Sequence, residues 1–252
     1  MSTRVAALDV RALAKRFGGV VAADDLSLQL DAGARHALIG PNGAGKTTFV
    51  RLVAGALEPD SGTVRVGGTD VTHASPHARV LQGLVRSYQI TSLFPSFSVF
   101  ENIALAVSQR LGNGLSVSSA RGFSQAVVDQ TEAIAIRLGL AGKGSVRVGD
   151  LPYGERRLVD LAITLALEPR VLLLDEPAAG LPAADRRALL AALQALPANV
   201  AVLLIEHDMD LVFEFAARIT VLAEGRCLAS GSPAEIRSSP EVRAAYLGKR
   251  HG

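Results

Sequence analysis

Alternating and β-rich hydrophobic patterns open the chain. Residues 5–17 and 26–30 carry such patterns on either side of Gly18-Gly19, and residues 63–66 end at a second glycine pair. Short runs of this kind, bounded by glycines, are typical of strands joined by turns. We therefore expect the paired strands of a small leading sheet.

Apolar residues at helical spacing dominate a stretch from about residue 91 to residue 155. Residues 101–110 and 125–138 predict two helices, and the polar, Gly/Ser-rich residues 112–121 between them predict a loop. We interpret this stretch as a helical subdomain inserted into a single domain that spans residues 1–252.

The remaining chain alternates between short apolar strands and amphipathic helices. The expected strands are residues 35–39, 84–88, 171–174 and 200–205, and the expected helices are residues 158–167, 183–196, 209–216 and one that begins at Thr47. Residues 218–222 and 226–229 predict a terminal hairpin. Uninterrupted apolar strands are buried on both faces where helices cover a parallel sheet. The pattern therefore predicts an α/β fold with a mainly parallel sheet.

Composition agrees with this fold class and excludes several kinds of function. Hydrophobic residues make up 49% of the 252 residues and aromatic residues only 4%, which suits an aliphatic core. A net charge of +2 is too small to indicate a nucleic-acid partner. The single cysteine, Cys227, excludes a disulfide framework, and we expect it to be a small buried residue in a late strand. The N-terminus lacks the apolar core of a signal peptide, and no aliphatic run approaches the ~20 residues that span a bilayer, so we expect a soluble, cytoplasmic protein.

A glycine-rich segment joins the strand at residues 35–39 to the helix that follows it. Its nine residues are Gly40, Pro41, Asn42, Gly43, Ala44, Gly45, Lys46, Thr47 and Thr48, which match the pattern G-x-x-x-x-G-K-[ST] of a phosphate-binding loop. The glycines let successive N–H groups point into one concavity at a helix N-terminus, where an anion binds. Lys46 adds a positive charge for the β- and γ-phosphates, and the Thr47 hydroxyl is an oxygen ligand for Mg²⁺. The segment therefore predicts a nucleotide site.

Two acidic residues and a histidine follow the later apolar strands. Asp175 and Glu176 come directly after residues 171–174, at the end of a strand where α/β proteins bind ligands. Asp175 is placed to hold Mg²⁺, in general through water, and Glu176 to polarise an attacking water as a general base. His207, after the strand at residues 200–205, either contacts the γ-phosphate or is an ordinary hydrogen-bonded residue.

A second anion site is indicated just before the helix expected at residues 158–167. The segment consists of Leu151, Pro152, Tyr153, Gly154 and Glu155. A glycine that opens a helix can bind an anion through unpaired N–H groups and the helix dipole. Pro-x-Gly is also ordinary turn chemistry, so the segment alone leaves both possibilities open. Its place about twenty residues before Asp175 favours the anion site.

The order of these motifs resembles that of ABC-transporter ATPase subunits. The phosphate-binding loop, Gln89, the segment 151–155, the Leu-Leu-Leu-Asp-Glu-Pro run at residues 172–177 and His207 follow one another as in that family, and the resemblance covers about residues 10–247. It implies a P-loop NTPase core with a mainly parallel sheet, an antiparallel β subdomain and an inserted α-helical subdomain.

The resemblance also implies roles for single residues. Phe17 would stack on adenine, and Gln89 would contact Mg²⁺ and the attacking water while linking the site to a membrane subunit. The segment 151–155 would be the signature segment, which acts in trans: through Gly154 it docks against ATP held by the opposing subunit. The loop at residues 178–181 would cross the dimer interface.

Finer similarities point to importers of branched-chain amino acids. The segments that carry them are residues 86–89, 93–95, 98–102, 153–155, 178–181, 204–209 and 240–248. Closely similar ATPases serve urea and short amides, and lipid or lipopolysaccharide exporters have similar cassettes, so these remain alternatives. Pro152 and Arg156 depart from the family, which often has Ser or Ala at the first position and Gln at the second.

By this resemblance the chain is an ATPase with ATP and Mg²⁺ as cofactors. Its partners would be integral membrane permease subunits, a second homologous ATPase subunit in a homodimer or heterodimer and, indirectly, a solute-binding protein. It would lie on the inner face of the cell membrane through the permease. Phe94, Phe97 and Phe100 are either contacts for a membrane-subunit helix or core residues.

Other ABC proteins fit the sequence less well. Members that act in DNA repair or chromosome structure have long heptad insertions or Cys-rich zinc modules, and translation-associated members have two cassettes in one chain. This chain has a single phosphate-binding loop and no heptad run. A non-hydrolysing module would lack catalytic residues, whereas Lys46, Asp175, Glu176 and His207 are all present.

Overall fold

Residues 5–87, 93–112 and 122–247 are described by the computed structural model, in which the chain forms two units. The first unit comprises the chain up to Arg86, Arg170–Glu176 and the chain from Ala198 onward. The second comprises Ser87–Pro169 and Pro177–Pro197. The helical stretch at residues 91–155 falls within the second unit, which continues beyond it.

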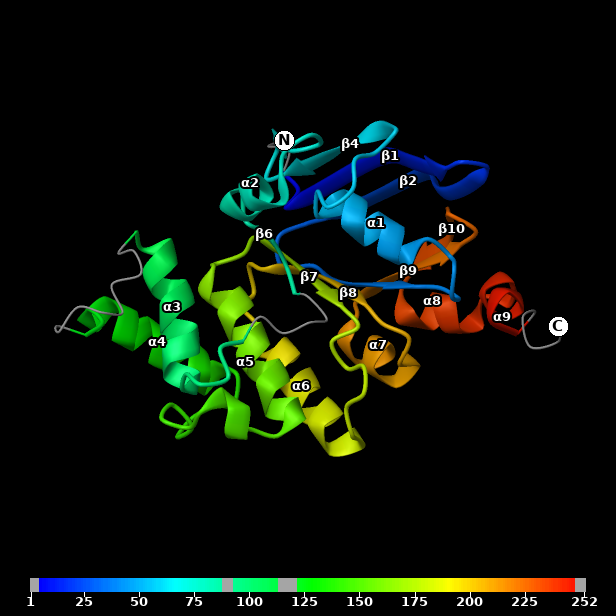
Figure 1. The fold of residues 1–252 in the computed structure, drawn as a ribbon. Coiled ribbons are helices and arrows are strands. Elements are labelled where there is room, and N and C mark those ends of the chain that lie inside the picture. Colours follow the sequence, from blue (N-terminus) through cyan, green and yellow to red (C-terminus); the bar gives the residue numbers. More distant parts are fainter. Residues whose placement is uncertain (1–4, 88–92, 113–121, 248–252) are drawn as a thin grey trace. The chain divides into compact units, whose positions relative to one another are not determined.

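A four-stranded antiparallel sheet belongs to the first unit (Figure 1). It contains, in the spatial order β2-β1-β4-β5, the strands β1 (Leu8–Phe17), β2 (Val20–Leu30), β4 (Ser61–Val66) and β5 (Thr69–Asp70). The expected leading sheet is therefore confirmed. β2 begins at Val20 rather than at residue 26, because the antiparallel register pairs Val20 with Phe17 directly across the glycine turn.

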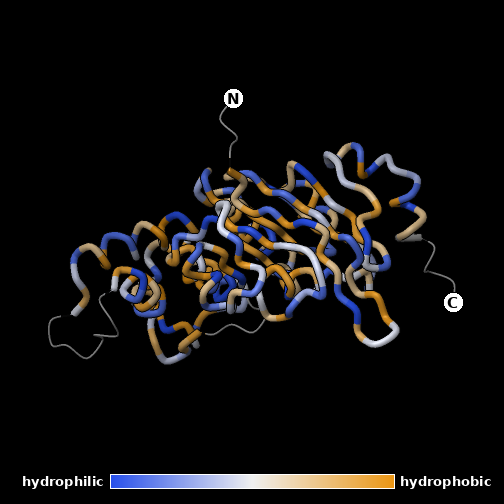
Figure 2. The backbone as a smooth tube through the Cα atoms, turned by 90° about the horizontal axis from the view of Figure 1, so that it is seen from above, coloured by the Kyte–Doolittle hydropathy of each residue, from blue (hydrophilic) through white to orange (hydrophobic). Residues whose placement is uncertain are grey.

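A six-stranded, mainly parallel sheet completes the strands of the first unit. Its order is β10-β9-β3-β8-β7-β6, with β3 (Arg35–Ile39), β6 (Leu84–Arg86), β7 (Val171–Asp175), β8 (Ala201–Ile205), β9 (Arg218–Ala223) and β10 (Arg226–Gly231). Only β9 and β10 pair antiparallel, as the predicted hairpin requires, and the predicted parallel sheet is confirmed. β7 and β8 are buried over their whole length. Figure 2 shows how hydrophobic and hydrophilic stretches alternate along the backbone.

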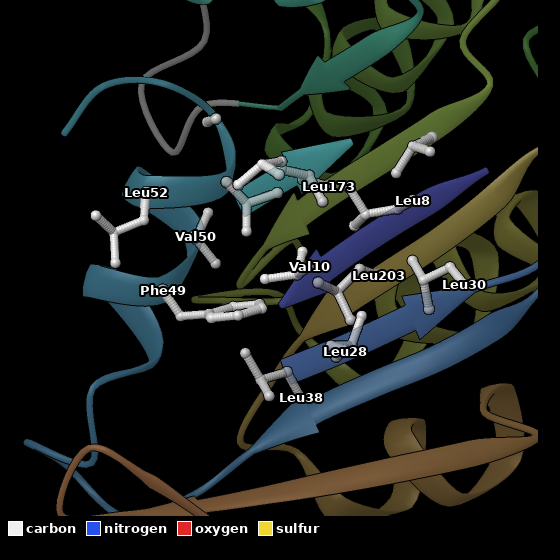
Figure 3. Close-up of a cluster of buried hydrophobic side chains, with 14 of the residues drawn as sticks. Leu8, Val10, Leu28, Leu30, Leu38, Phe49, Val50, Leu52, Leu173 and Leu203 are labelled. Carbon is white, nitrogen blue, oxygen red and sulfur yellow. The ribbon is translucent and has the colours of Figure 1, made fainter. Parts of the chain in front are cut away.

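The main core of the first unit joins both sheets to one helix, α1 (Lys46–Val53). Phe49, Val50, Leu52 and Val53 of α1 are each at most 2% exposed. Figure 3 shows Phe49 reaching from α1 toward Val10 of the antiparallel sheet, within the same cluster as side chains of the parallel sheet. This packing fixes the end of α1 and, with it, the glycine-rich segment just before it.

Short helices complete the first unit. They are α2 (Pro76–Leu81), α7 (Met209–Phe215), α8 (Pro233–Ser238) and α9 (Pro240–Leu247). The helical pattern predicts α7 but misses α2, α8 and α9. α2 and α8 have six residues each, too few to show a clear apolar period. Their caps carry the signal instead: Ser75 and Ser232 each precede a proline and accept a hydrogen bond from the first turn.

Four α-helices belong to the described residues of the second unit. They are α3 (Val99–Arg110), α4 (Gln125–Arg137), α5 (Tyr153–Ala166) and α6 (Ala183–Gln194). α5 packs against the other three. α3 begins two positions before the predicted residue 101 because Ser98 and Glu101 form a capping box. α5 begins at Tyr153 rather than at residue 158, so the segment 151–155 includes the first turn of a helix.

The prediction that Cys227 is buried is wrong. Cys227 is exposed on β10. β10 is the outermost strand of its sheet, so its side chains are less covered than those of the central strands.

No helix among the described residues is both long and apolar enough to cross a membrane.

Candidate functional site

The glycine-rich segment forms a tight loop between β3 and α1. Gly40 and Gly45 have φ angles of 154° and 100°, which a residue with a side chain rarely adopts. A Cβ atom at Gly40 would lie 2.3 Å from the Leu222 carbonyl oxygen, and one at Gly45 would lie 2.5 Å from the Ala22 carbonyl oxygen. The loop therefore needs glycine at both positions for conformation and for space.

The N-terminus of α1 faces this loop without a side-chain cap. Gly45 is the N-cap residue and has no side chain to accept a hydrogen bond from the first turn, and the first turn contains no acidic residue. The first N–H groups of a helix have no partner within the helix and carry its positive dipole. This end of α1 can therefore bind a phosphate group, as the sequence predicts.

Lys46 is held against the loop by backbone carbonyl groups. Its side chain is buried, and its Nζ donates hydrogen bonds to the carbonyl oxygens of Gly40 at 2.7 Å and Pro41 at 3.1 Å. Burial lowers the pKa of the Lys46 ammonium, while the nearby carboxylates of Glu176 and Asp175 oppose that shift. The cation therefore lies at the phosphate-binding loop and within the electrostatic field of both acidic residues.

Asp175 and Glu176 lie where β7 ends. Asp175 is 8% exposed, and its Oδ2 accepts a hydrogen bond from Arg86 Nη2 at 2.6 Å. Glu176 has a left-handed φ of 50° and donates its backbone N–H to the carbonyl of Ile205 at 2.9 Å. A non-glycine residue rarely takes this conformation, and such strain is concentrated at functional sites.

His207 lies close to Glu176. The His207 Nδ1 atom is 3.8 Å from Glu176 Oε1 and 4.0 Å from Glu206 Oε2, and the imidazole is 66% exposed. Glu206 is 1% exposed and accepts a hydrogen bond from the His207 backbone N–H at 3.1 Å. The adjacent ends of β7 and β8 thus bring His207 and Glu176 together at a distance that a shared water or phosphate oxygen can bridge.

The segment 151–155 lies in the second unit, where it opens α5. Pro152 is the N-cap residue and makes no side-chain cap hydrogen bond. Gly154 is buried against α6, since a Cβ atom there would lie 2.5 Å from the Asp185 carboxylate. Tyr153 is 48% exposed, and its hydroxyl accepts a hydrogen bond from Arg157 Nη2 at 2.6 Å. This helix N-terminus retains backbone N–H groups for an anion, without a hydroxyl at its N-cap.

Phe17 lies at the end of a strand of the antiparallel sheet. Phe17 ends β1 with its ring 48% exposed, and Lys15 Nζ is 5.9 Å from the ring centroid. An exposed ring can stack on a base. Gln89 lies outside the described residues.

The donor set fits a magnesium nucleotide. Thr47 is exposed in the first turn of α1, and Asp175 supplies a carboxylate from the end of β7. Hydroxyl and carboxylate oxygens are hard ligands of the kind that Mg²⁺ prefers, and Mg²⁺ takes its remaining ligands from water and phosphate. Thr47 and Asp175 could therefore hold the metal while the loop and Lys46 hold the phosphates.

Two charged residues of this site were missed in the sequence. Arg86 pairs with Asp175, and Glu206 lies beside His207. The available signal was their position, because Arg86 and Glu206 stand at or just after the ends of β6 and β8, the two neighbours of β7. Residues at the carboxyl ends of neighbouring parallel strands meet at one edge of the sheet.

Comparison with known proteins identifies relatives along nearly the whole chain. The family model described as ABC transporter matches residues 23–179, and the model described as Branched-chain amino acid ATP-binding cassette transporter matches residues 226–252. The chain is 36% identical to LivG of Salmonella typhimurium and to BraF of Pseudomonas aeruginosa, each a high-affinity branched-chain amino acid transport ATP-binding protein. Each alignment covers 96% of this chain and 98% of the relative.

A solved structure has the same fold. It is the crystal structure of the ADP conformation of MJ1267, an ATP-binding cassette of an ABC transporter, with a TM-score of 0.84 and 26% sequence identity. The superposition covers 97% of this chain and 99% of that one. The antiparallel sheet, the mainly parallel sheet and the helices described above therefore form an ATP-binding cassette fold.

Proposed function

Because the chain belongs to the ABC transporter family as a subunit that hydrolyses ATP, we propose that its ATP hydrolysis drives the uptake of branched-chain amino acids. The observation that carries this choice of solute is the match of residues 226–252 to the branched-chain amino acid model. That segment lies outside residues 23–179, which match the general family. It therefore supports the subfamily independently of the residues that match the general family.

The proposed reaction begins with ATP at the end of α1. The loop N–H groups and Lys46 bind the phosphates, and Phe17 stacks on adenine. Thr47, Asp175 and Gln89 would hold Mg²⁺, which neutralises phosphate charge when bound. The buried, carbonyl-held position of Lys46 supports this assignment, because it holds the ammonium beside the loop.

Glu176 and His207 act on the attacking water in this proposal. Glu176 orients the water and accepts its proton, while His207 contacts the γ-phosphate. The 3.8 Å separation between His207 Nδ1 and Glu176 Oε1 supports a role for both residues at one reacting centre.

Integral membrane permease subunits are the proposed partners, with a solute-binding protein acting through them. The ATPase would then lie on the inner face of the membrane. Co-purification of the chain with its membrane subunits, followed by solute binding to the complex, tests the proposal. Recovery of a complex that binds leucine supports the proposed solute. A complex that binds only urea or a lipid would instead support the corresponding alternative transporter.

The proposed docking surface for the permease includes Phe94. Its side chain is 53% exposed, and its ring stacks on Phe97 with 5.2 Å between centroids. Phe97 and Phe100 are half-buried, so they also contribute to the core of the second unit. An exposed aromatic ring next to a packed one is a suitable anchor for an apolar partner helix.

Phe94→Asp is therefore expected to stop transport and to leave basal ATP hydrolysis within about twofold of wild type, because surface substitutions outside a site change stability little. Uptake by the assembled transporter and phosphate release by the isolated subunit measure the two effects. Leu81→Asp is the matched control, since Leu81 is 72% exposed on α2 of the first unit. Normal transport by Phe94→Asp would show that the permease docks on another surface of the ATPase.

Pro152 offers a test of the proposed signature segment. We propose that this segment binds the γ-phosphate of ATP held by a second, homologous ATPase subunit. Pro152 has neither a hydroxyl nor an N–H group to donate, so the N–H groups of Tyr153 and Gly154 must make the contact. A serine hydroxyl would add one hydrogen bond to a charged group, worth about 1.5–3 kcal/mol before strain.

Pro152→Ser is expected to raise hydrolysis about tenfold at the partner's site, without changing the ATP affinity of the isolated subunit. The assay pairs the variant with a partner whose own phosphate-binding lysine is replaced, so that only the site built from Lys46 is active. That remaining activity should not respond to Pro152→Ser. A large change in it would show that Pro152 acts within its own subunit.

A further inference from the structure

An ion pair joins the ends of two neighbouring parallel strands. Arg86 is the last residue of β6 and Asp175 the last of β7, and Arg86 Nη2 lies 2.6 Å from Asp175 Oδ2. The two side chains are 14% and 10% exposed. The parallel register, which pairs Arg86 with Leu173, lets the guanidinium reach the carboxylate beyond it.

This pair differs from the ion pairs at the surface of the same unit. Arg226 and Asp24 also form a short contact, but their side chains are 73% and 30% exposed. Water and salt screen such an exposed pair, whereas partial burial strengthens the attraction between Arg86 and Asp175. Removal of one partner from a buried pair leaves the other charge uncompensated.

Asp175 faces two cations with different roles. On the proposed function, on which this inference rests, Asp175 holds Mg²⁺, yet its carboxylate already accepts a hydrogen bond from Arg86. Lys46 is also close enough for Asp175 and Glu176 to oppose the shift of its pKa. Mg²⁺ that approaches Asp175 must therefore compete with Arg86 for the carboxylate, and both Arg86 and Lys46 repel it.

We propose that Arg86 is the internal counter-ion of Asp175 and lowers the affinity of the site for free Mg²⁺. The phosphates of ATP add negative charge and metal ligands, and they offset the repulsion that Arg86 causes. Mg²⁺ then binds together with nucleotide rather than alone. Arg86 is in this respect a positioning residue, because it acts on the metal through Asp175.

The test is Mg²⁺ binding without nucleotide, measured as the rise of the unfolding temperature with Mg²⁺ concentration. Arg86→Gln is expected to lower the half-saturating Mg²⁺ concentration about tenfold, which corresponds to about 1.4 kcal/mol of lost repulsion and competition. It is also expected to unfold at a lower temperature than wild type when Mg²⁺ is absent, because Asp175 loses its partner.

Arg86→Lys gives a second test that keeps the charge, so that the proposal remains testable if Arg86→Gln does not fold. Lysine keeps the positive charge but lacks the guanidinium Nη2 that donates to Asp175 Oδ2, so the Mg²⁺ affinity of the Arg86→Lys variant should lie between those of wild type and Arg86→Gln. Arg226→Gln is the matched control and should not change Mg²⁺ binding. Unchanged or weaker Mg²⁺ binding by Arg86→Gln would overturn the proposal, because that is the result expected if Arg86 only supports the fold. If only Arg86→Lys folds, the same result in that variant would overturn it.

Asp175→Asn separates this inference from the proposed function. If Asp175→Asn weakens Mg²⁺ binding and the Arg86 variants fail to strengthen it, only the role of Arg86 is wrong. If Asp175→Asn binds Mg²⁺ as wild type does, Asp175 is not a metal ligand, and both the metal assignment and the role of Arg86 fail.

Discussion

Lys46→Ala is expected to weaken ATP binding by at least about a hundredfold, because it removes the cation that the loop holds beside the phosphate site. Titration of the purified variant with a fluorescent ATP analogue measures the loss. Its unfolding temperature shows whether the fold persists, since the variant also loses two hydrogen bonds to loop carbonyls.

Arg51→Ala is the matched control for Lys46→Ala. Arg51 is an exposed cation in the last turn of the same helix, at the end away from the loop. The Arg51→Ala variant should bind ATP as wild type does, because the positive charge that it loses lies one helical turn or more from the phosphate site. If folded Lys46→Ala binds ATP with wild-type affinity, Lys46 does not contribute to the nucleotide site.

Glu176→Gln is expected to keep ATP binding and to lower hydrolysis by at least about a hundredfold, the usual contribution of a general base. The amide has nearly the same shape as the carboxylate but cannot accept the proton of the attacking water. Phosphate release measures the loss of turnover. An ATP-bound dimer should accumulate, and light scattering detects it as a doubling of mass.

Glu168→Gln is the matched control for Glu176→Gln, because both replace a glutamate that has a left-handed backbone. Glu168 also has a left-handed φ, 51°, and its exposed carboxylate pairs with Arg110 in the second unit. The substitution should leave hydrolysis unchanged, since Glu168 lies outside the phosphate site. Full hydrolysis by Glu176→Gln would show that another group activates the water.

The sequence predicts the main elements of the fold because their signals are local. Uninterrupted apolar runs mark β7 and β8, and the helical period marks α3 to α6. The glycine pattern before Lys46 predicts the loop at the end of α1 for the same reason. Element ends are less accurate, as at Tyr153, because a proline N-cap rather than the apolar period decides where α5 begins.

Contacts that depend on strand order are not visible in the sequence. Arg86 reaches Asp175 only because β6 and β7 are neighbours, although the two residues are far apart along the chain. Cys227 was wrongly predicted to be buried because an edge strand has the same local pattern as an inner one. The need for glycine at position 154 likewise depends on Asp185 of another helix.

Leucine uptake into vesicles that contain the permease subunits and this ATPase tests the central claim most directly. ATP should drive leucine uptake with the wild-type chain, and the Glu176→Gln variant, which binds ATP but does not hydrolyse it, should give no uptake above the ATP-free level. ATP hydrolysis by the wild-type complex without any uptake of leucine, or uptake that persists with Glu176→Gln, would contradict the claim.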